Sequence, residues 1–404
     1  MTTGTSPAAA SPDELRARVR QFLAAHDPAS AGESGRLEFL RARFDAGLAW
    51  VHFPAGLGGL GLPRPLQQVV DEEFRAVGAP DNRPGRIGIG LGMAAPTILA
   101  SGTEDQKRRW LRPLWTGEEV WCQLFSEPGA GSDLAALGTR AVRDGGDWVI
   151  DGQKVWTSMA HRARWAILVA RTDPDVPKHQ GITYFGCDMS APGIEVRPLR
   201  QATGEAEFNE VFFNGARISD WCRIGEVGGG WRVAQTTLMN ERIAIGGGAQ
   251  PRESGMIGAA ARTWRDRPEL RSAGLHGRLL DLWVQAEVAR LAGMRLRQQI
   301  AAGAPGPEGS ANKLTFARLS QQISGLEMEI AAEDGLRYDD WTMRRPEATD
   351  FTARTPGYRY LRAKGNSIEG GTSEILRNII AERVLGLPRE PRTDTSVAWK
   401  DLPR

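Results

Sequence analysis

The chain has 404 residues, of which 41% are apolar and 25% are charged, and its formal net charge is +2. That length allows two or three domains with a large buried core, and the balanced charge excludes a strong field for nucleic acid or an anionic membrane surface. No apolar run reaches the roughly eighteen residues of a membrane-spanning helix. The five histidines form no HxxxH or HExxH pattern, so we expect no metal site.

The N-terminal residues and the cysteines indicate the cellular compartment of the protein. The start, MTTGTSPAAASPD, has no basic stretch followed by an apolar one, so we expect a short disordered tail over residues 1–10 rather than a signal peptide. Cys122, Cys187 and Cys222 are odd in number and lack CxxC spacing, which is typical of a reducing compartment. Both features favour a cytoplasmic protein.

Residues 1–119 should form a helical domain. Ser11 and, three residues later, Glu14 make a capping box ahead of apolar residues at helical spacing. Two further helices are expected, over residues 65–78 and 103–118, with the second broken at its internal proline.

The stretch GLGGLG, residues 56–61, matches the dinucleotide fingerprint G-x-G-x-x-G letter for letter. That fingerprint needs a strand before it and a helix after it. Here Pro63 and Pro65 fall where the helix should begin, and no alternating strand–helix pattern surrounds the motif. We therefore predict a loop without dinucleotide chemistry.

From residue 120 to residue 228 the pattern changes to short runs of strand-forming residues. The stretch RAVRDGGDWVIDGQKVWTS, residues 140–158, suggests strands separated by tight turns at 144–147 and at 151–152. Similar runs continue from residue 163 to residue 218. This region should be a β-barrel or sandwich inserted between helical regions.

Residues 229–387 become helical again, as in a helix bundle. The expected helices cover residues 231–245, 271–302, 311–337 and 373–385. The residues from Pro388 onward should be an extended tail. Together these patterns predict an α+β chain of several domains.

Two short motifs in the β region carry polar and aromatic groups. In LFSEPGAGSDLAAL, residues 124–137, Gly129, Gly131 and the Ser132 hydroxyl can present N–H and O–H groups to a phosphate or a flavin edge, although an ordinary surface turn has the same composition. In KVWTS, residues 154–158, a tryptophan stands beside two hydroxyls at a strand end. It is either a core residue or an aromatic wall for a ring system.

The combination of SEPGAGSD and KVWTS at this spacing, followed by GTSEI and RNIIAERVLG, resembles the acyl-CoA dehydrogenase family from about residue 10 to residue 387. The resemblance implies an N-terminal helical domain, a middle β-barrel domain and a C-terminal four-helix bundle. It also implies a non-covalent FAD, conversion of an acyl-CoA thioester to a 2,3-enoyl-CoA, and electron transfer to an electron-transfer flavoprotein. A homodimer or homotetramer would complete the FAD site, and a hetero-oligomer is also compatible.

The same resemblance assigns site residues. In this chain the cofactor contacts would be Phe125, Ser126, Gly131, Ser132, Trp156, Thr157, Ser158, Arg262, Thr372 and Glu374. Trp156 would cover one flavin face, Ser158 would reach toward N5, and Arg262 would reach the cofactor of a neighbouring subunit. The substrate contacts would be Ser132, Arg242 and Gly370. The family's Phe-Gly after that arginine is replaced here by Arg265 and Asp266.

A base must remove the α-proton of the thioester, and two glutamates are candidates. The stretch SIEGGTSEI, residues 367–375, holds Glu369, with Thr372 or Ser373 as the cap of the following helix. In many family members the base precedes this helix, but the register puts that position on Gly370 and leaves Glu369 one residue off.

A second branch of the family takes its base from the first helix of the bundle, directly before an arginine. Here Glu241 precedes Arg242. The residues of its helical stripe are Ala234, Leu238, Glu241 and Ile245. A carboxylate on an apolar stripe is costly to bury, so it favours a function over a structural ion pair. We therefore favour Glu241 over Glu369, while a chain without an active base stays open.

Two other functions are compatible with the sequence. Relatives on this fold use reduced flavin with oxygen as oxygenases or oxidases. A base-less partner subunit in a hetero-oligomeric dehydrogenase is the second alternative. Within the dehydrogenase hypothesis, Gly370 and Gly371 would leave room near the acyl α-carbon, which favours a branched or bulky acyl chain.

Overall fold

The computed structural model describes residues 11–28, 32–246, 251–301, 308–338, 340–346, 354–391 and 394–403. The chain divides into two compact units, residues 1–121 and residues 122–404. No helix in these described ranges is both long and apolar enough to cross a membrane.

The first unit is helical, as expected. Its helices are α1 Pro12–Ala25, α2 Gly32–Asp45, α3 Gln67–Ala76, α4 Pro84–Ile89, α5 Ala95–Ser101 and α6 Glu104–Thr116. The capping box is confirmed, because the Glu14 N–H donates to Ser11 Oγ at 3.2 Å and the Ser11 N–H donates to Glu14 Oε2 at 2.7 Å. The GLGGLG stretch is a loop, with no helix until a short turn at Arg64–Leu66.

The expected break at Pro113 is wrong, since α6 continues through it to Thr116. Proline removes one hydrogen bond and crowds the preceding turn. Here the cost falls in the last turn only, before the left-handed cap Gly117. The buried side chains of Trp110 and Leu114 anchor the helix on both sides of the proline.

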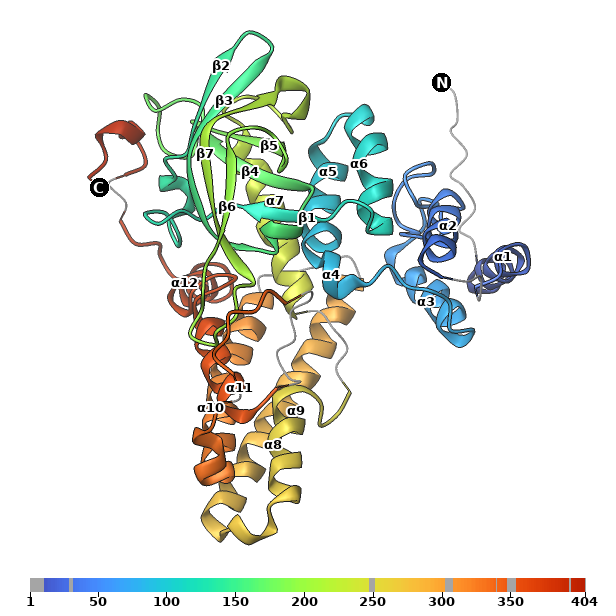
Figure 1. Cartoon of the computed structure of the whole chain (residues 1–404), viewed down its shortest axis with the longest axis vertical. Coiled ribbons are helices and arrows are strands. Elements are labelled where there is room, and N and C mark those ends of the chain that lie inside the picture. Colours follow the sequence, from blue (N-terminus) through green and yellow to red (C-terminus); the bar gives the residue numbers. More distant parts are fainter. Residues whose placement is uncertain are drawn as a thin grey trace. The chain divides into compact units, whose positions relative to one another are not determined.

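The second unit begins with a single seven-stranded sheet that curls on itself (Figure 1). Its strands are β1 Trp121–Leu124, β2 Arg140–Asp144, β3 Asp147–Ser158, β4 Trp165–Arg171, β5 Ile182–Asp188, β6 Ile194–Pro198 and β7 Phe208–Ser219. The spatial order is β1-β4-β2-β3-β7-β6, with β5 paired to β4. The core of this sheet includes the buried side chains of Trp148, Phe185 and Val211.

The turn expected at residues 151–152 is wrong, because β3 runs without interruption from Asp147 to Ser158. The pairing of β3 with β7 shifts register between Ile150 and Gly152. Gly152 has φ +150° and approaches Thr139 so closely that an added Cβ would lie 2.6 Å from Thr139 Oγ1. The Asp-Gly pair therefore marks a β-bulge rather than a chain reversal.

A helical bundle follows the sheet (Figure 1). Its helices are α7 Gly230–Gly246, α8 Gly255–Asp266, α9 Ala273–Ala301, α10 Gly309–Ala331, α11 Pro356–Ala363 and α12 Ser373–Arg383. Helices α8 and α11 were not predicted from the sequence. Helix α10 contacts the other five, and the core between α8, α9 and α10 is aliphatic.

The extended tail expected from Pro388 is wrong for residues 394–403. A short helical turn forms at Trp399–Asp401, and Ala398 makes a β-bridge with Pro177. This difference arises because the Trp399 indole packs against Arg171 and donates to Ala136 O in the β region instead of remaining in solvent.

Candidate functional site

The most unusual residue of the sheet is Trp156, near the end of β3. Its backbone has φ +59°, and the β3–β7 pairing shifts register between Lys154 and Thr157. A bulky residue in the left-handed region costs on the order of 1–3 kcal/mol, yet 58% of Trp156 is exposed. The core alternative for this tryptophan is therefore wrong. Strain and bulges of this kind concentrate at functional sites.

The two hydroxyls after Trp156 differ in environment. Thr157 is fully buried, but its Oγ1 atom has no hydrogen-bond partner among the described residues. Ser158 is half-buried and lies opposite Phe208 in the β3–β7 ladder. The Phe208 ring meets the Trp156 ring edge-on at 5.8 Å. An exposed indole beside an unsatisfied buried hydroxyl fits a ligand that has both a flat ring and polar edge atoms.

The glycine loop lies next to this strand end. The Val155 N–H donates to Ser126 O at 2.9 Å, and the loop turns tightly between Glu127 and Ala130. Gly131 and Ser132 are exposed at its tip, and an added Cβ at Gly131 would meet no atom within 4 Å. The loop therefore leaves backbone N–H groups open to a ligand.

The glycine loop is held by an ion pair between Lys154 and Glu127. Lys154 is fully buried, and its Nζ donates to Phe125 O at 2.9 Å and to Glu127 Oε1 at 2.8 Å. The Glu127 carboxylate also accepts from the N–H groups of Gly138 (2.7 Å) and Thr139 (2.9 Å). Burial lowers the pKa of Lys154, and the adjacent Glu127 carboxylate opposes that shift. Both ends of the loop are thus tied to one charged pair.

Phe125 connects the loop to the bundle. It is buried and meets the Tyr184 ring edge-on at 5.9 Å. The Tyr184 hydroxyl lies 2.9 Å from Thr237 Oγ1 on α7. Glu241 follows about one helical turn after Thr237 and is half-buried.

The stripe predicted for α7 is partly visible. Ala234 is buried and Leu238 is half-buried, as expected for an inward face. The side chains of Ile245 and Arg242 lie outside the described part of the chain, so these two predictions stay untested.

The SIEGGTSEI stretch forms the entrance to α12. Thr372 is confirmed as its cap, with Oγ1 accepting from the Ile375 N–H at 3.2 Å. Gly370 and Gly371 have φ angles of +63° and +97°, and a residue with a side chain would adopt these backbone conformations only with strain. Glu369 is held in a two-bond ion pair with Arg362, at 2.9 and 3.0 Å.

Arg362 also brings this stretch to the sheet. It lies 3.3 Å from the Glu207 carboxylate, and its guanidinium is 5.7 Å from the Phe208 ring centre. Phe208 in turn contacts Trp156. Glu369 is therefore linked to the tryptophan wall through one arginine and one aromatic ring.

The sequence did not single out Lys313 on α10, which binds the backbone on both sides of Glu369. Its Nζ donates to Asn366 O at 2.8 Å and to Gly371 O at 2.7 Å. Burial lowers the pKa of Lys313, and the carboxylates of Glu369 and Glu241 oppose that shift. The missed signal is a lysine on a helical stripe whose other members, Ala317, Ser320 and Ser324, are buried.

The structure thus links most of the predicted residues into one region. The links join the glycine loop and Trp156 to Phe208 and Arg362. Lys313 binds the α12 entrance, and the charge of Glu241 acts on it. Arg262 and Glu374 differ, because both are exposed on the surface of this chain. Glu374 forms a one-turn ion pair with Arg377 at 3.3 Å.

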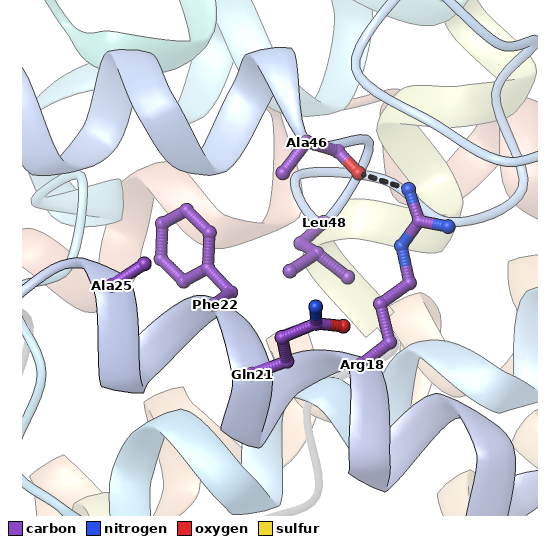
Figure 2. Close-up of a pocket in the computed structure, with 6 residues that line it drawn as sticks. All are labelled: Arg18, Gln21, Phe22, Ala25, Ala46 and Leu48. Carbon is purple, nitrogen blue, oxygen red and sulfur yellow. Dashed lines mark hydrogen bonds between the residues drawn. The ribbon is translucent and has the colours of Figure 1, made fainter.

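A separate shallow pocket of about 280 Å³ lies in the first unit (Figure 2). It is lined by Arg18, Gln21, Phe22, Ala25, Ala46 and Leu48. Arg18 lies at one side of it and donates to Ala46 O at 3.0 Å. None of the predicted site residues lines this pocket, so it does not belong to the site built above.

Family models match nearly the whole chain. They describe the acyl-CoA dehydrogenase N-terminal domain over residues 10–118, the middle domain over residues 122–216 and the C-terminal domain over residues 228–385.

Two mycobacterial proteins are similar in sequence. Acyl-CoA dehydrogenase IpdE1 of Mycobacterium tuberculosis is 36% identical over 407 residues, which cover 94% of this chain and 99% of IpdE1. Acyl-CoA dehydrogenase FadE34 of the same organism is 42% identical over 351 residues, which cover 85% of this chain and 45% of FadE34. The chain therefore spans less than half the length of that second relative.

Two solved structures are similar in fold. The Tcur3481-Tcur3483 steroid ACAD has a TM-score of 0.69 and 27% identity, with 96% of this chain and 100% of that chain covered. The ChsE4-ChsE5 complex from Mycobacterium tuberculosis has a TM-score of 0.67 and 27% identity, again with coverage of 96% and 100%.

Proposed function

The chain belongs to the acyl-CoA dehydrogenase family, a family of FAD-dependent oxidoreductases, and on that premise we propose that it dehydrogenates an acyl-CoA between Cα and Cβ with Glu241 as the base. The observation that carries this proposal is Trp156, which is strained, exposed and followed by a buried hydroxyl with no partner among the described residues.

The residues near Trp156 fit FAD. The indole offers a flat surface for a ring system, and Thr157 and Ser158 offer hydroxyls at its edge. The open N–H groups around Gly131 and the N-terminus of α12 suit a pyrophosphate. When bound, FAD supplies the acceptor for the hydride that leaves Cβ.

Glu241 suits the role of base better than Glu369 does. The base must accept a proton from a very weak carbon acid, so it needs a carboxylate held close to the acyl α-carbon. Glu369 is fixed by two hydrogen bonds to Arg362, which hold its charge in place. Glu241 lies on the half-buried face of α7, one turn from the contact of α7 with the sheet.

The acyl group is proposed to be bulky, in the class of steroid-derived thioesters. One structural neighbour is described as a steroid ACAD. In this chain Gly370, which has no side chain, occupies the position of the base in other family branches, and its φ of +63° disfavours any residue that has one. An electron-transfer flavoprotein is the proposed acceptor of the electrons.

An anaerobic screen tests this function. Purified flavoprotein is mixed with CoA thioesters of straight-chain, branched and steroid acids, and the flavin absorbance is followed. We expect bleaching fastest with the polycyclic thioesters. No bleaching with any thioester, together with oxygen consumption when a flavin reductase is added, would instead support an oxygenase or oxidase.

A second candidate is one subunit of a hetero-oligomeric dehydrogenase. The names of both structural neighbours give two different chains. In this chain α9 also carries an exposed apolar stripe, formed by Leu280, Val284, Val288 and Leu291. Such a stripe indicates a surface that another subunit covers. A chain that binds no FAD alone but binds it after co-expression with a second family member would support this candidate.

A further inference from the structure

The C-terminal segment, residues 394–403, returns to the sheet unit beyond the region that the family model matches. That match ends at residue 385. The Trp399 N–H donates to Val176 O at 2.9 Å and the Lys400 N–H donates to Pro174 O at 3.0 Å. These backbone bonds fix the segment beside the loop between β4 and β5.

The Trp399 side chain reaches the base of the glycine loop. Its Nε1–H donates to Ala136 O at 3.0 Å. Its ring lies against Gly138, where an added Cβ would be 3.6 Å from the indole. Arg171 also contacts this ring, with its guanidinium carbon 4.7 Å from the ring centre.

Arg171 itself is buried and holds the two carbonyls that flank Ala136. It donates to Ala135 O at 2.5 Å and to Leu137 O at 3.2 Å. Three consecutive carbonyls at the end of the loop are therefore bound by one arginine and one tryptophan.

A second contact links the segment to the loop. Lys178 is buried and its Nζ lies between two carboxylates, Asp133 at 2.6 Å and Asp394 at 2.5 Å. Asp133 directly follows Ser132 in the chain. The C-terminal segment is thus tied to both ends of residues 133–138.

We propose that residues 394–403 act as a clamp, with Trp399 as a positioning residue that holds the Gly131–Ser132 tip in its ligand-binding conformation. This inference rests on the proposed function, since the ligand at the tip is the FAD pyrophosphate. Lys154 and Glu127 tie the start of the loop to Gly138 and Thr139 at its end. Trp399 and Arg171 bind the three carbonyls that precede Gly138.

The clamp has a clear physical benefit. The tip itself is exposed and glycine-rich, so ordering it during binding costs conformational entropy. A loop whose two ends are already fixed loses less entropy when the ligand binds, and its affinity is correspondingly higher.

The test compares Trp399→Ala, Trp399→Phe and the wild type. Amide hydrogen exchange of residues 127–138 is measured in the flavin-free protein, and the Kd for FAD is measured by flavin fluorescence. Trp399→Ala loses a hydrogen bond and a cation–π contact, so we expect faster exchange in this loop and a Kd about tenfold higher. Trp399→Phe keeps a ring over Arg171 and should recover part of both effects.

Lys400→Ala is the matched control, because the Lys400 side chain pairs only with exposed Asp175 at 2.6 Å in the described structure. It should leave loop exchange and FAD affinity unchanged. Unchanged exchange and Kd in Trp399→Ala would overturn the clamp, even though FAD still binds. If the wild type binds no FAD, the proposed function fails first. If Trp399→Ala does not fold, the same two measurements on Trp399→Phe decide the matter.

Discussion

The two halves of the candidate site are built differently. Around Trp156, the sheet fixes the glycine loop through the buried Lys154–Glu127 pair and through Arg171 and Trp399. At the α7 side, Glu241 is half-buried about one helical turn after Thr237, whose hydroxyl lies 2.9 Å from the Tyr184 hydroxyl, and its charge acts on Lys313. The first half is a loop held by several buried side chains, whereas the second is a carboxylate carried by a helix.

This difference teaches that cofactor binding and proton abstraction can be perturbed separately. Removing a buried ion pair or hydrogen bond that holds the glycine loop should weaken FAD binding and lower the free energy of unfolding together. Changing Glu241 should stop the chemistry while the glycine loop and its ligand stay in place.

Glu241→Gln should lower the rate of anaerobic flavin reduction about a hundredfold to ten-thousandfold, the usual contribution of a general base. The amide cannot take the α-proton but has nearly the same shape. FAD content and the flavin spectrum should not change. The rate is measured by stopped-flow absorbance with the best thioester from the screen.

Glu369→Gln is the matched control for that experiment. Because Glu369 is paired with Arg362, its variant should keep a reduction rate within a few-fold of wild type. If Glu369→Gln abolishes reduction while Glu241→Gln does not, the assignment of the base is reversed.

Lys154→Met should destabilise the glycine loop and weaken FAD binding. It leaves the Glu127 carboxylate buried without its cation, which costs about 3–5 kcal/mol in the free energy of unfolding. FAD affinity should fall as well. Urea unfolding and FAD titration measure the two effects.

The double variant Lys154→Met with Glu127→Gln is the control, because it removes both charges and keeps an amide oxygen for the loop N–H groups. It should recover part of the lost stability. Equal destabilisation of the single and double variants would contradict the view that charge pairing holds this loop.

Lys313→Met should perturb the connection between the two halves. It leaves the Asn366 and Gly371 carbonyls without their donor, at a cost of about 1–3 kcal/mol. Removing a nearby cation raises the pKa of a carboxylate. The acidic limb of the pH profile for flavin reduction should therefore also move to higher pH.

Lys364→Met is the control for Lys313, since Lys364 is exposed on the same domain and its ammonium lies over the Tyr360 ring. Its pH profile should match wild type. A shift of equal size in both variants would indicate a general charge effect rather than a local one.

The smallest effect concerns the acid stability of the glycine loop. Burial alone would raise the pKa of Glu127, but Lys154 and the hydrogen bonds from Thr139 and Gly138 outweigh it and hold that pKa below the usual range. The unfolded chain, with a glutamate pKa of about 4.3, then binds the proton first as pH falls. The stability that Glu127 supplies is therefore present above that pKa and lost as pH drops through the lower, folded value.

Urea unfolding between about pH 6 and pH 3 measures this loss, which follows the linkage relation. Glu127→Gln should show a flatter decline over that range because it has no proton to gain at this position. Parallel curves for wild type and variant would show that other carboxylates carry the acid sensitivity.

The sequence by itself determined the features that lie within a few residues of one another. The capping residue Ser11, the strands from β4 to β7 and the helices α7, α9, α10 and α12 follow from local period and polarity, whereas the choice of Thr372 over Ser373 as a cap came from the structure. The motif combination also identified the family correctly. The domain boundaries expected at residues 119 and 228 and the cytoplasmic location stay predictions.

Tertiary structure decided the features that join distant residues. The Asp151–Gly152 pair looked like a turn, but pairing with β7 made it a bulge. Trp399 looked like part of a tail, yet its partner Ala136 lies 263 residues earlier.

Glu369 stands seven residues from Arg362, and its place near Trp156 still depends on Phe208 from another strand. Local pattern records which face of an element is apolar. It does not record which distant group will meet that face, because that depends on how the whole chain packs.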